Sequence, residues 1–221
     1  MTIVSDLFGR APETPVGGPT WQSLSPVGWN NAGGSGLNLS SNALVSPGAT
    51  DNISAVNTTA YPPNKTQFAE VKLTTVNTSG AIGPAVNLRN GTGRCNGFGV
   101  SWDDGAGALS IFRWTGNFEF YSVSYSISST ISVNDVIRLE CTDNNAISAN
   151  TVKLRIYKNG TLVGAEQTLT FEDSFGAGQI GVWSSGAGNG VIDEFNGGDL
   201  ITAATSLLVR RPRINPGILC Q

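Results

Sequence analysis

Few residues in this chain could carry out acid–base or nucleophilic chemistry. There is no histidine among its 221 residues, which removes Ser-His and Cys-His nucleophiles, histidine general bases and most zinc sites. The acidic pairs Asp103-Asp104, Glu172-Asp173 and Asp193-Glu194 are adjacent in sequence. On a strand, adjacent side chains point to opposite faces, so the two carboxylates of each pair could not act together on one substrate. The sequence therefore predicts a protein that is not an enzyme.

Two tryptophans are the strongest candidates for ligand contact. Trp114 alternates with Leu109 and Ile111, and Trp183 alternates with Ile180. If these aliphatic residues fill a core, both tryptophans face outward, where an indole can stack on the apolar side of a sugar. Two alternatives stay open: both side chains lie in the core, or both cover a contact with another subunit.

Two further patterns suggest ligands more weakly. Asp103, Asp104, Asp143 and Asn144 could supply oxygen ligands to calcium, although such residues in turns usually hydrogen-bond their own backbone. No other cofactor is expected. Residues 176–181 match G-x-G-x-x-G, but a strand rather than a helix follows, which indicates a turn and not a nucleotide site.

The stretch that contains residues 152–163 gives the most specific structural signal. Val152, Leu154 and Ile156 alternate with polar or larger side chains, as in a strand with one buried face. The pair Asn159-Gly160 follows and is typical of a type I′ hairpin turn, because both central residues need a positive φ. The pattern predicts a hairpin and hence an antiparallel sheet.

Strand patterns recur about every ten residues with Gly- and Asn-rich turns between them, and there is no helical window. This spacing predicts an all-β fold, an antiparallel two-sheet sandwich or jelly roll. We expect one domain over residues 1–202. The expected strands lie at residues 3–8, 68–76, 81–88, 98–102, 109–114, 120–127, 137–141, 152–163, 179–183 and 191–195.

Composition limits the partners and the setting. The net charge of −3 argues against nucleic acid, and no apolar run approaches the length of a membrane span. The first eight residues lack the basic and apolar regions of a signal peptide. Cys95, Cys141 and Cys220 are too few for a disulfide framework, although one disulfide stays open. Cys141 is expected to be a small buried hydrophobe.

The last residues, 203–221, differ from the rest. They contain Arg210, Arg211 and Arg213 between apolar segments. One interpretation is a solvated tail. The other is an arm that anchors the chain to a partner subunit through these arginines.

The order of elements resembles the concanavalin A-like jelly-roll superfamily, in its laminin-G-like branch. The matching segments are Ser5–Arg10, Gly97–Trp102, Val136–Glu140, Leu154–Gly160, Gly178–Trp183 and Ile192–Phe195. The resemblance implies that the last strand, around Phe195, lies beside the first, around Phe8. The resemblance covers roughly residues 5–200. Its matching motifs are structural and say little about function. The Glu-x-Asp-x-x-Glu and Gln-x-His motifs of the superfamily's glucanases and lyases are absent.

These observations favour a non-enzymatic structural, decoration or attachment protein of a larger surface assembly, with a phage-type virion as its setting. Its partners would be other subunits, in a homo-oligomer or with capsid or tail proteins, and cell-surface glycans. The alternative is a glycan-binding, lectin-like module. A polysaccharide-active glycosidase or lyase is a remote alternative.

Overall fold

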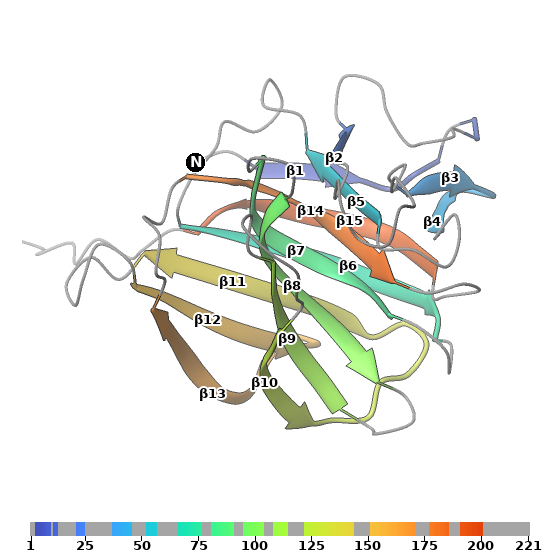
Figure 1. Ribbon diagram of the computed structural model, residues 1–221. Helices are drawn as coiled ribbons and strands as arrows, with labels where there is room; N and C mark the ends of the chain where they lie inside the picture. The colour runs from blue at the N-terminus through green and yellow to red at the C-terminus, as the bar shows by residue number, and fades with distance from the viewer. Residues whose placement is uncertain are drawn as a thin grey trace, which may run out of the picture.

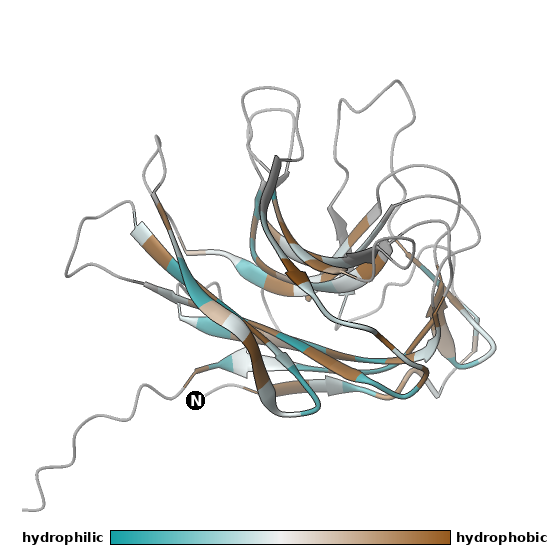
Figure 2. Cartoon of the chain, turned by 90° about the horizontal axis from the view of Figure 1, so that it is seen from below, coloured by the Kyte–Doolittle hydropathy of each residue, from teal (hydrophilic) through white to brown (hydrophobic). Residues whose placement is uncertain are grey.

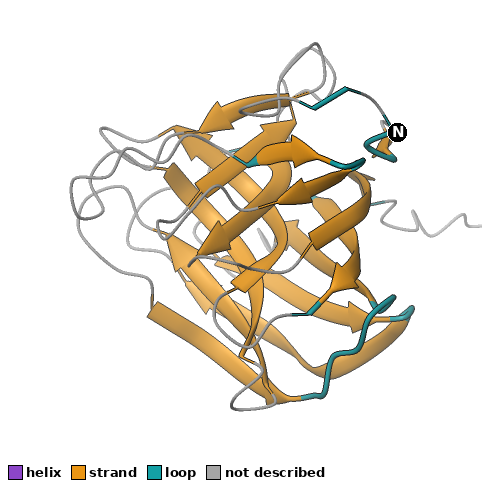
Figure 3. Cartoon of the chain, turned by 90° about the vertical axis from the view of Figure 1, so that its right-hand side faces the viewer, coloured by secondary structure: helices purple, strands orange, loops and turns teal. Residues whose placement is uncertain are grey.

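The computed structural model describes residues 3–9, 11–12, 21–24, 37–45, 52–56, 66–76, 81–90, 95–103, 108–114, 122–143, 151–170, 177–185 and 191–200. These residues form strands and turns (Figure 3). No described segment is a helix long and apolar enough to cross a membrane.

The larger of the two sheets has eight strands in the order β13-β12-β11-β6-β15-β4-β3, and β1 also pairs with β15 (Figure 1). All its pairings are antiparallel. Its strands are β1 (Ile3–Asp6), β3 (Asn38–Ser40), β4 (Ala43–Val45), β6 (Gln67–Thr75), β11 (Val136–Asp143), β12 (Thr151–Lys158), β13 (Thr161–Thr170) and β15 (Val191–Asp199).

The smaller sheet has seven strands, also antiparallel, in the order β10-β9-β8-β7-β14-β5-β2. They are β2 (Trp21–Leu24), β5 (Asn52–Val56), β7 (Ala81–Asn90), β8 (Cys95–Asp103), β9 (Ala108–Trp114), β10 (Ser122–Ser128) and β14 (Gln179–Ser185). The predicted all-β, antiparallel two-sheet architecture is confirmed.

One core lies between the sheets, and both contribute to it (Figure 2). Val71 and Leu139 of the eight-stranded sheet and Val100 and Ile111 of the seven-stranded sheet are at most 1% exposed. Cys141 belongs to the same core, as its alternation predicted. The inward face of each strand is therefore fixed by period-2 burial, which leaves the opposite face for polar or functional side chains.

The first and last strands lie side by side, as the resemblance implied. β1 pairs with β15, and Asp6 stands opposite Phe195. The Asp6 carboxylate accepts hydrogen bonds from the Phe8 amide and from the Trp21 indole, both at 2.7 Å. Trp21 in turn packs edge-on against Phe195, with ring centroids 4.9 Å apart. One carboxylate thus ties the N-terminal segment to the closing strand.

The predicted hairpin joins β12 and β13. Asn159 and Gly160 have φ values of 51° and 77°, as a type I′ turn requires. The turn also docks on the segment before β11. The Asn159 side chain donates to the Asp135 carboxylate at 2.7 Å and accepts from the Val136 amide at 2.8 Å. Asn159 therefore both makes the turn and fixes its position.

Candidate functional site

The outer face of the seven-stranded sheet carries a second apolar cluster, separate from the core between the sheets. Its members are buried side chains from four strands: Ile53, Ala55, Ala85, Leu88, Phe112 and Trp183. This face also holds one of the tryptophans expected to bind a ligand, so its geometry decides whether the predicted stacking site exists.

Phe112 and Trp183 meet across two intervening strands. β9 and β14 are separated by β8 and β7, a span of about 14 Å at the usual strand spacing. The two ring centroids are nevertheless 5.4 Å apart, with the ring planes at 60°. The strands between them carry Gly83, Ala85 and Gly99, which have little or no side chain. Both large rings can therefore extend over β7 and β8 and pack together.

The Trp183 indole also donates a hydrogen bond to a backbone carbonyl for which the neighbouring strand has no N–H donor. Its Nε1 donates to the carbonyl of Val100 at 2.9 Å. Pairing of β7 with β8 runs through Ala85–Gly99, and one further step of this register places Pro84 opposite Val100. Because proline has no N–H, it cannot serve this carbonyl in a central strand. The indole supplies the missing donor.

This geometry corrects one prediction from the sequence. Trp183 does lie on the opposite face from Ile180 and Val182, as the alternation indicated, but it is 0% exposed. The predicted outward platform for a sugar is therefore wrong at Trp183, because its ring lies over Gly83 and against Phe112. Trp114 ends β9 opposite Gly97. Its side chain lies outside the described part of the structure, so stacking at Trp114 stays a prediction.

A row of serines crosses the same face beside Phe112. Ser101 of β8 and Ser126 of β10 both stand opposite Ser110 of β9 (strands in Figure 1). The Ser110 hydroxyl donates to that of Ser126 at 3.1 Å. Ser101 and Ser110 are buried, whereas Ser126 is exposed. Each hydroxyl can donate one and accept two hydrogen bonds, and Ser126 is the member that offers these bonds at the surface.

The sequence contained a signal for this serine row, but only a partial one. Serines alternate with larger residues along Ser122–Ser128, which places them on one face of a strand. The register in which β10 and β8 each pair with β9 brings Ser126, Ser110 and Ser101 into one line. Ser101 and Ser126 are 25 residues apart in sequence, and nothing in the local patterns specifies that register.

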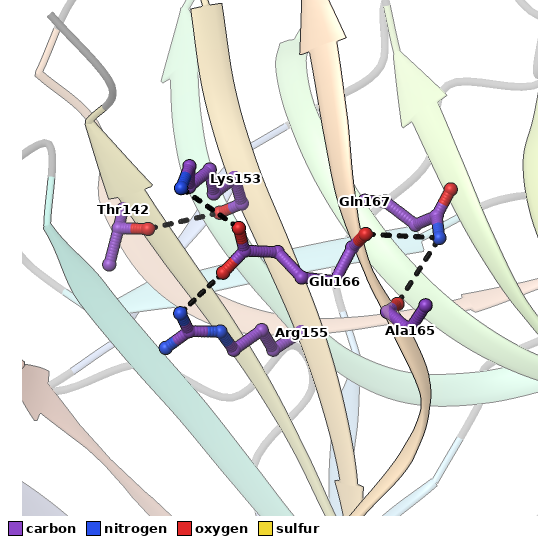
Figure 4. A network of polar contacts seen from close by, with 6 residues as sticks. All are labelled: Thr142, Lys153, Arg155, Ala165, Glu166 and Gln167. Atoms are coloured by element: carbon purple, nitrogen blue, oxygen red, sulfur yellow. Dashed lines mark hydrogen bonds and ion pairs between the residues drawn. The ribbon is translucent and has the colours of Figure 1, made fainter. Parts of the chain in front are cut away.

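A second polar group lies on the eight-stranded sheet, where β12 meets β13 (Figure 4). The Glu166 carboxylate forms ion pairs with Lys153 at 3.0 Å and with Arg155. The hydrogen bond from Lys153 lowers the pKa of Glu166 below its ordinary value; burial opposes this shift, and Arg155 adds to it. Glu166 is thus held ionised, unlike a general acid, which needs a raised pKa.

A bulge in β13 positions Glu166. The pairing with β12 shifts register between Leu154 and Ile156, and Gly164 has a φ of 71°, the left-handed conformation that favours glycine. The bulge's backbone is bonded by side chains. Gln167 donates to the carbonyls of Ala165 and Glu166 at 3.1 and 3.3 Å (Figure 4), and the Ala165 amide donates to the Tyr125 hydroxyl at 3.4 Å.

The remaining candidate residues are not brought together within the described structure. Asp103 ends β8 of the smaller sheet and Asp143 ends β11 of the larger one; their side chains, and all of Asp104 and Asn144, lie outside the described part. Among the described residues no three His, Cys, Asp or Glu side chains form a metal-binding group. The arm at 203–221, with Arg210, Arg211 and Arg213, also lies outside the described residues and stays a prediction.

Comparisons with known proteins define the fold class. No family model and no curated protein sequence matches the chain. Among solved structures, a β-glucanase of Bacillus licheniformis is similar over 90% of this chain and 99% of its own, at 10% identity and a TM-score of 0.53. The carbohydrate recognition domain of Emp46p, in its metal-free form, is similar over 81% and 88%, at 10% identity and a TM-score of 0.52. The chain therefore has a concanavalin A-like jelly-roll fold.

Proposed function

We propose that this chain is a carbohydrate-binding, lectin-like module without catalytic activity. The observation that carries the proposal is the serine row of Ser101, Ser110 and Ser126, which ends in the exposed side chain of Ser126. A glycan would contact the row from the Ser126 end, because Ser126 is the exposed member.

The row suits a sugar for two reasons. The exposed Ser126 side chain is bonded by the buried Ser110 hydroxyl at 3.1 Å, so its position is fixed before a sugar arrives. Each hydroxyl of the row can both donate and accept, as is needed to match the hydroxyls of a sugar.

Two further observations support the class. A carbohydrate recognition domain and a β-glucanase share the fold. The carboxylates in the described ion pairs are matched with cations: Glu140 with Arg138, Glu166 with Lys153 and Arg155, and Glu194 with Lys72. At Glu166 the pairing lowers the pKa and keeps the carboxylate ionised, whereas glycoside hydrolysis needs one protonated acid beside one ionised partner. The proposal therefore favours binding over turnover.

A glycan array followed by calorimetry tests the proposal. Ser126→Ala removes the exposed hydroxyl and should weaken binding roughly two- to tenfold, the usual effect of one lost hydrogen bond. Ser126→Tyr should block the face more strongly. Ser40→Ala, an exposed serine on β3 of the other sheet, is the matched control and should leave the affinity unchanged.

Two outcomes would contradict glycan binding at the serine row. One is a protein that binds no glycan on the array. The other is an affinity that survives Ser126→Tyr while Trp114→Ala abolishes it, which would move the site to Trp114. Release of reducing ends from any bound polysaccharide would instead show that the module is an enzyme.

A further inference from the structure

The docked hairpin turn holds an asparagine that is chemically labile. Both ends of the Asn159 side-chain amide are bonded: Oδ1 accepts from Val136 N–H at 2.8 Å, and Nδ2 donates to Asp135 Oδ1 at 2.7 Å. The Asn159 backbone amide also donates to the Val136 carbonyl at 2.8 Å. Asp135 is itself fixed by the Ser132 amide at 2.8 Å and by Lys158 at 3.7 Å.

Asparagine followed by glycine can lose its amide without any co-reactant except water. The backbone nitrogen of Gly160 gives up its proton and attacks Cγ of Asn159, and the Cγ–Nδ2 bond breaks with release of ammonia. Water then opens the resulting succinimide to aspartate or isoaspartate. Glycine permits the attack because it has no side chain to obstruct its nitrogen.

In the folded chain two hydrogen bonds hold the Asn159 side chain, and any rotation that brings its Cγ toward the Gly160 nitrogen must loosen them. Rotation breaks the bonds to Val136 and Asp135 together and leaves the buried Asp135 carboxylate, 8% exposed, without one of its donors. Charge-assisted hydrogen bonds of this kind are about twice as strong as neutral ones. The docked turn therefore suppresses the reaction.

We propose that Asn159 is a deamidation site that is latent while the hairpin turn is docked on Asp135 and reactive once the turn undocks. The product would prevent redocking. An aspartate at position 159 has no N–H to donate and sets a second carboxylate against Asp135, where like charges repel. Isoaspartate also lengthens the backbone and disrupts the two-residue turn. The modification would thus record, irreversibly, that the hairpin had opened.

Peptide mapping by mass spectrometry tests this directly. The full chain is incubated at mildly alkaline pH in buffer and in urea, beside Asp135→Ala and Asp135→Asn in buffer. Asn159 should convert roughly tenfold or more faster in urea and in Asp135→Ala than in the folded wild type, as expected from one lost charged partner. Asn196-Gly197 is the internal control, because Asn196 accepts from Ser5 at 2.6 Å within β15, far from the turn in sequence.

Circular dichroism first establishes that each variant is folded. Asp135→Asn keeps an oxygen acceptor for Asn159 Nδ2 and should accelerate Asn159 less than Asp135→Ala does. The proposal is overturned if Asn159 reacts as fast in the folded wild type as in urea. It is equally overturned if folded Asp135→Ala leaves the Asn159 rate unchanged, or accelerates Asn159 and Asn196 alike.

Discussion

The indole nitrogen of Trp183 lies 2.9 Å from the backbone carbonyl of Val100, a residue two strands away in the same sheet. This side-chain bond replaces the backbone bond that Pro84 cannot make, and the indole reaches its acceptor because Gly83 leaves the path open. Three residues on two strands are thus interdependent: on β7 a proline without a donor and a glycine without a side chain, and on β14 a tryptophan with a donor at its edge.

Substitution of Trp183 should therefore lower stability and leave ligand binding alone. Trp183→Phe keeps an aromatic ring but leaves the Val100 carbonyl unbonded, at a cost of about 1–3 kcal/mol. Trp183→Ala also opens a cavity against Phe112, at a cost of about 3–5 kcal/mol. Urea unfolding measures both free energies. Leu162→Ala, at a side chain that is 44% exposed, should change stability by less than about 0.5 kcal/mol. Equal losses for Trp183→Phe and Leu162→Ala would show that the indole bond contributes nothing.

The close approach at Gly83 predicts a steep cost for even one added carbon. A Cβ at Gly83 would lie 2.0 Å from the Val100 oxygen, so β7 and β8 would have to move apart. We expect Gly83→Ala to destabilise the fold by more than about 3 kcal/mol, measured as a shift of the unfolding midpoint. At Gly9 a Cβ meets nothing within 4 Å, and Gly9→Ala should be nearly neutral. A folded, fully stable Gly83→Ala protein would refute the proposed path of the indole.

Stability should depend on the charge of Glu166 in a defined pH range. Its pKa in the folded chain lies below the ordinary value of 4.5, chiefly because of the hydrogen bond from Lys153. The stabilisation is therefore fully present above about pH 4.5 and is lost as the pH falls through the lowered folded value. Because all three side chains are partly exposed, its size should be at most about 1 kcal/mol.

Comparison with Glu166→Gln isolates this contribution. The difference in unfolding free energy between wild type and Glu166→Gln should be largest near pH 7 and should shrink toward pH 3. A difference that stays constant across that range would mean that the ion pairs to Lys153 and Arg155 add nothing to stability.

Loss of the Asp6 carboxylate should release the N-terminal segment. Asp6→Ala removes the acceptor of the Phe8 amide and of the buried Trp21 indole, which should cost about 1–3 kcal/mol. Asp6→Asn keeps one oxygen acceptor and should cost less. Hydrogen exchange should show faster exchange of the β1 amides in Asp6→Ala, while exchange in β12 stays unchanged. Uniform acceleration in both strands would instead indicate global destabilisation.

Local patterns in the sequence were sufficient for most of the strands and for the hairpin, although β2 and β5 were not expected. Asn159-Gly160 specifies its turn through a backbone requirement that few residues meet, and alternation placed Cys141 in the core. The paired residues of β1 and β15 are at least 189 positions apart in the sequence, and the smallest separation is that between Asp6 and Phe195. This pairing came from resemblance to a fold family and not from any local pattern.

The site could be predicted only in part, for a physical reason. Alternation assigns Trp183 to a face, but its exposure depends on Gly83, Ala85 and Gly99, which lie on two other strands. The serine row depends in the same way on the register of Ser101 and Ser126 against Ser110. Side-chain environment across a sheet is set by long-range pairing, which a single strand's pattern does not contain.

The bulge in β13 has a consequence for how this protein behaves among copies of itself. β13 is the outermost strand of its sheet, and exposed outer strands are where chains join edge to edge into aggregates. Here Gln167 already bonds the carbonyls of Ala165 and Glu166, and Tyr125 already bonds the amide of Ala165. An incoming strand would have to displace these contacts and straighten the bulge at Gly164, so this border of the sheet is a poor template for edge-to-edge pairing.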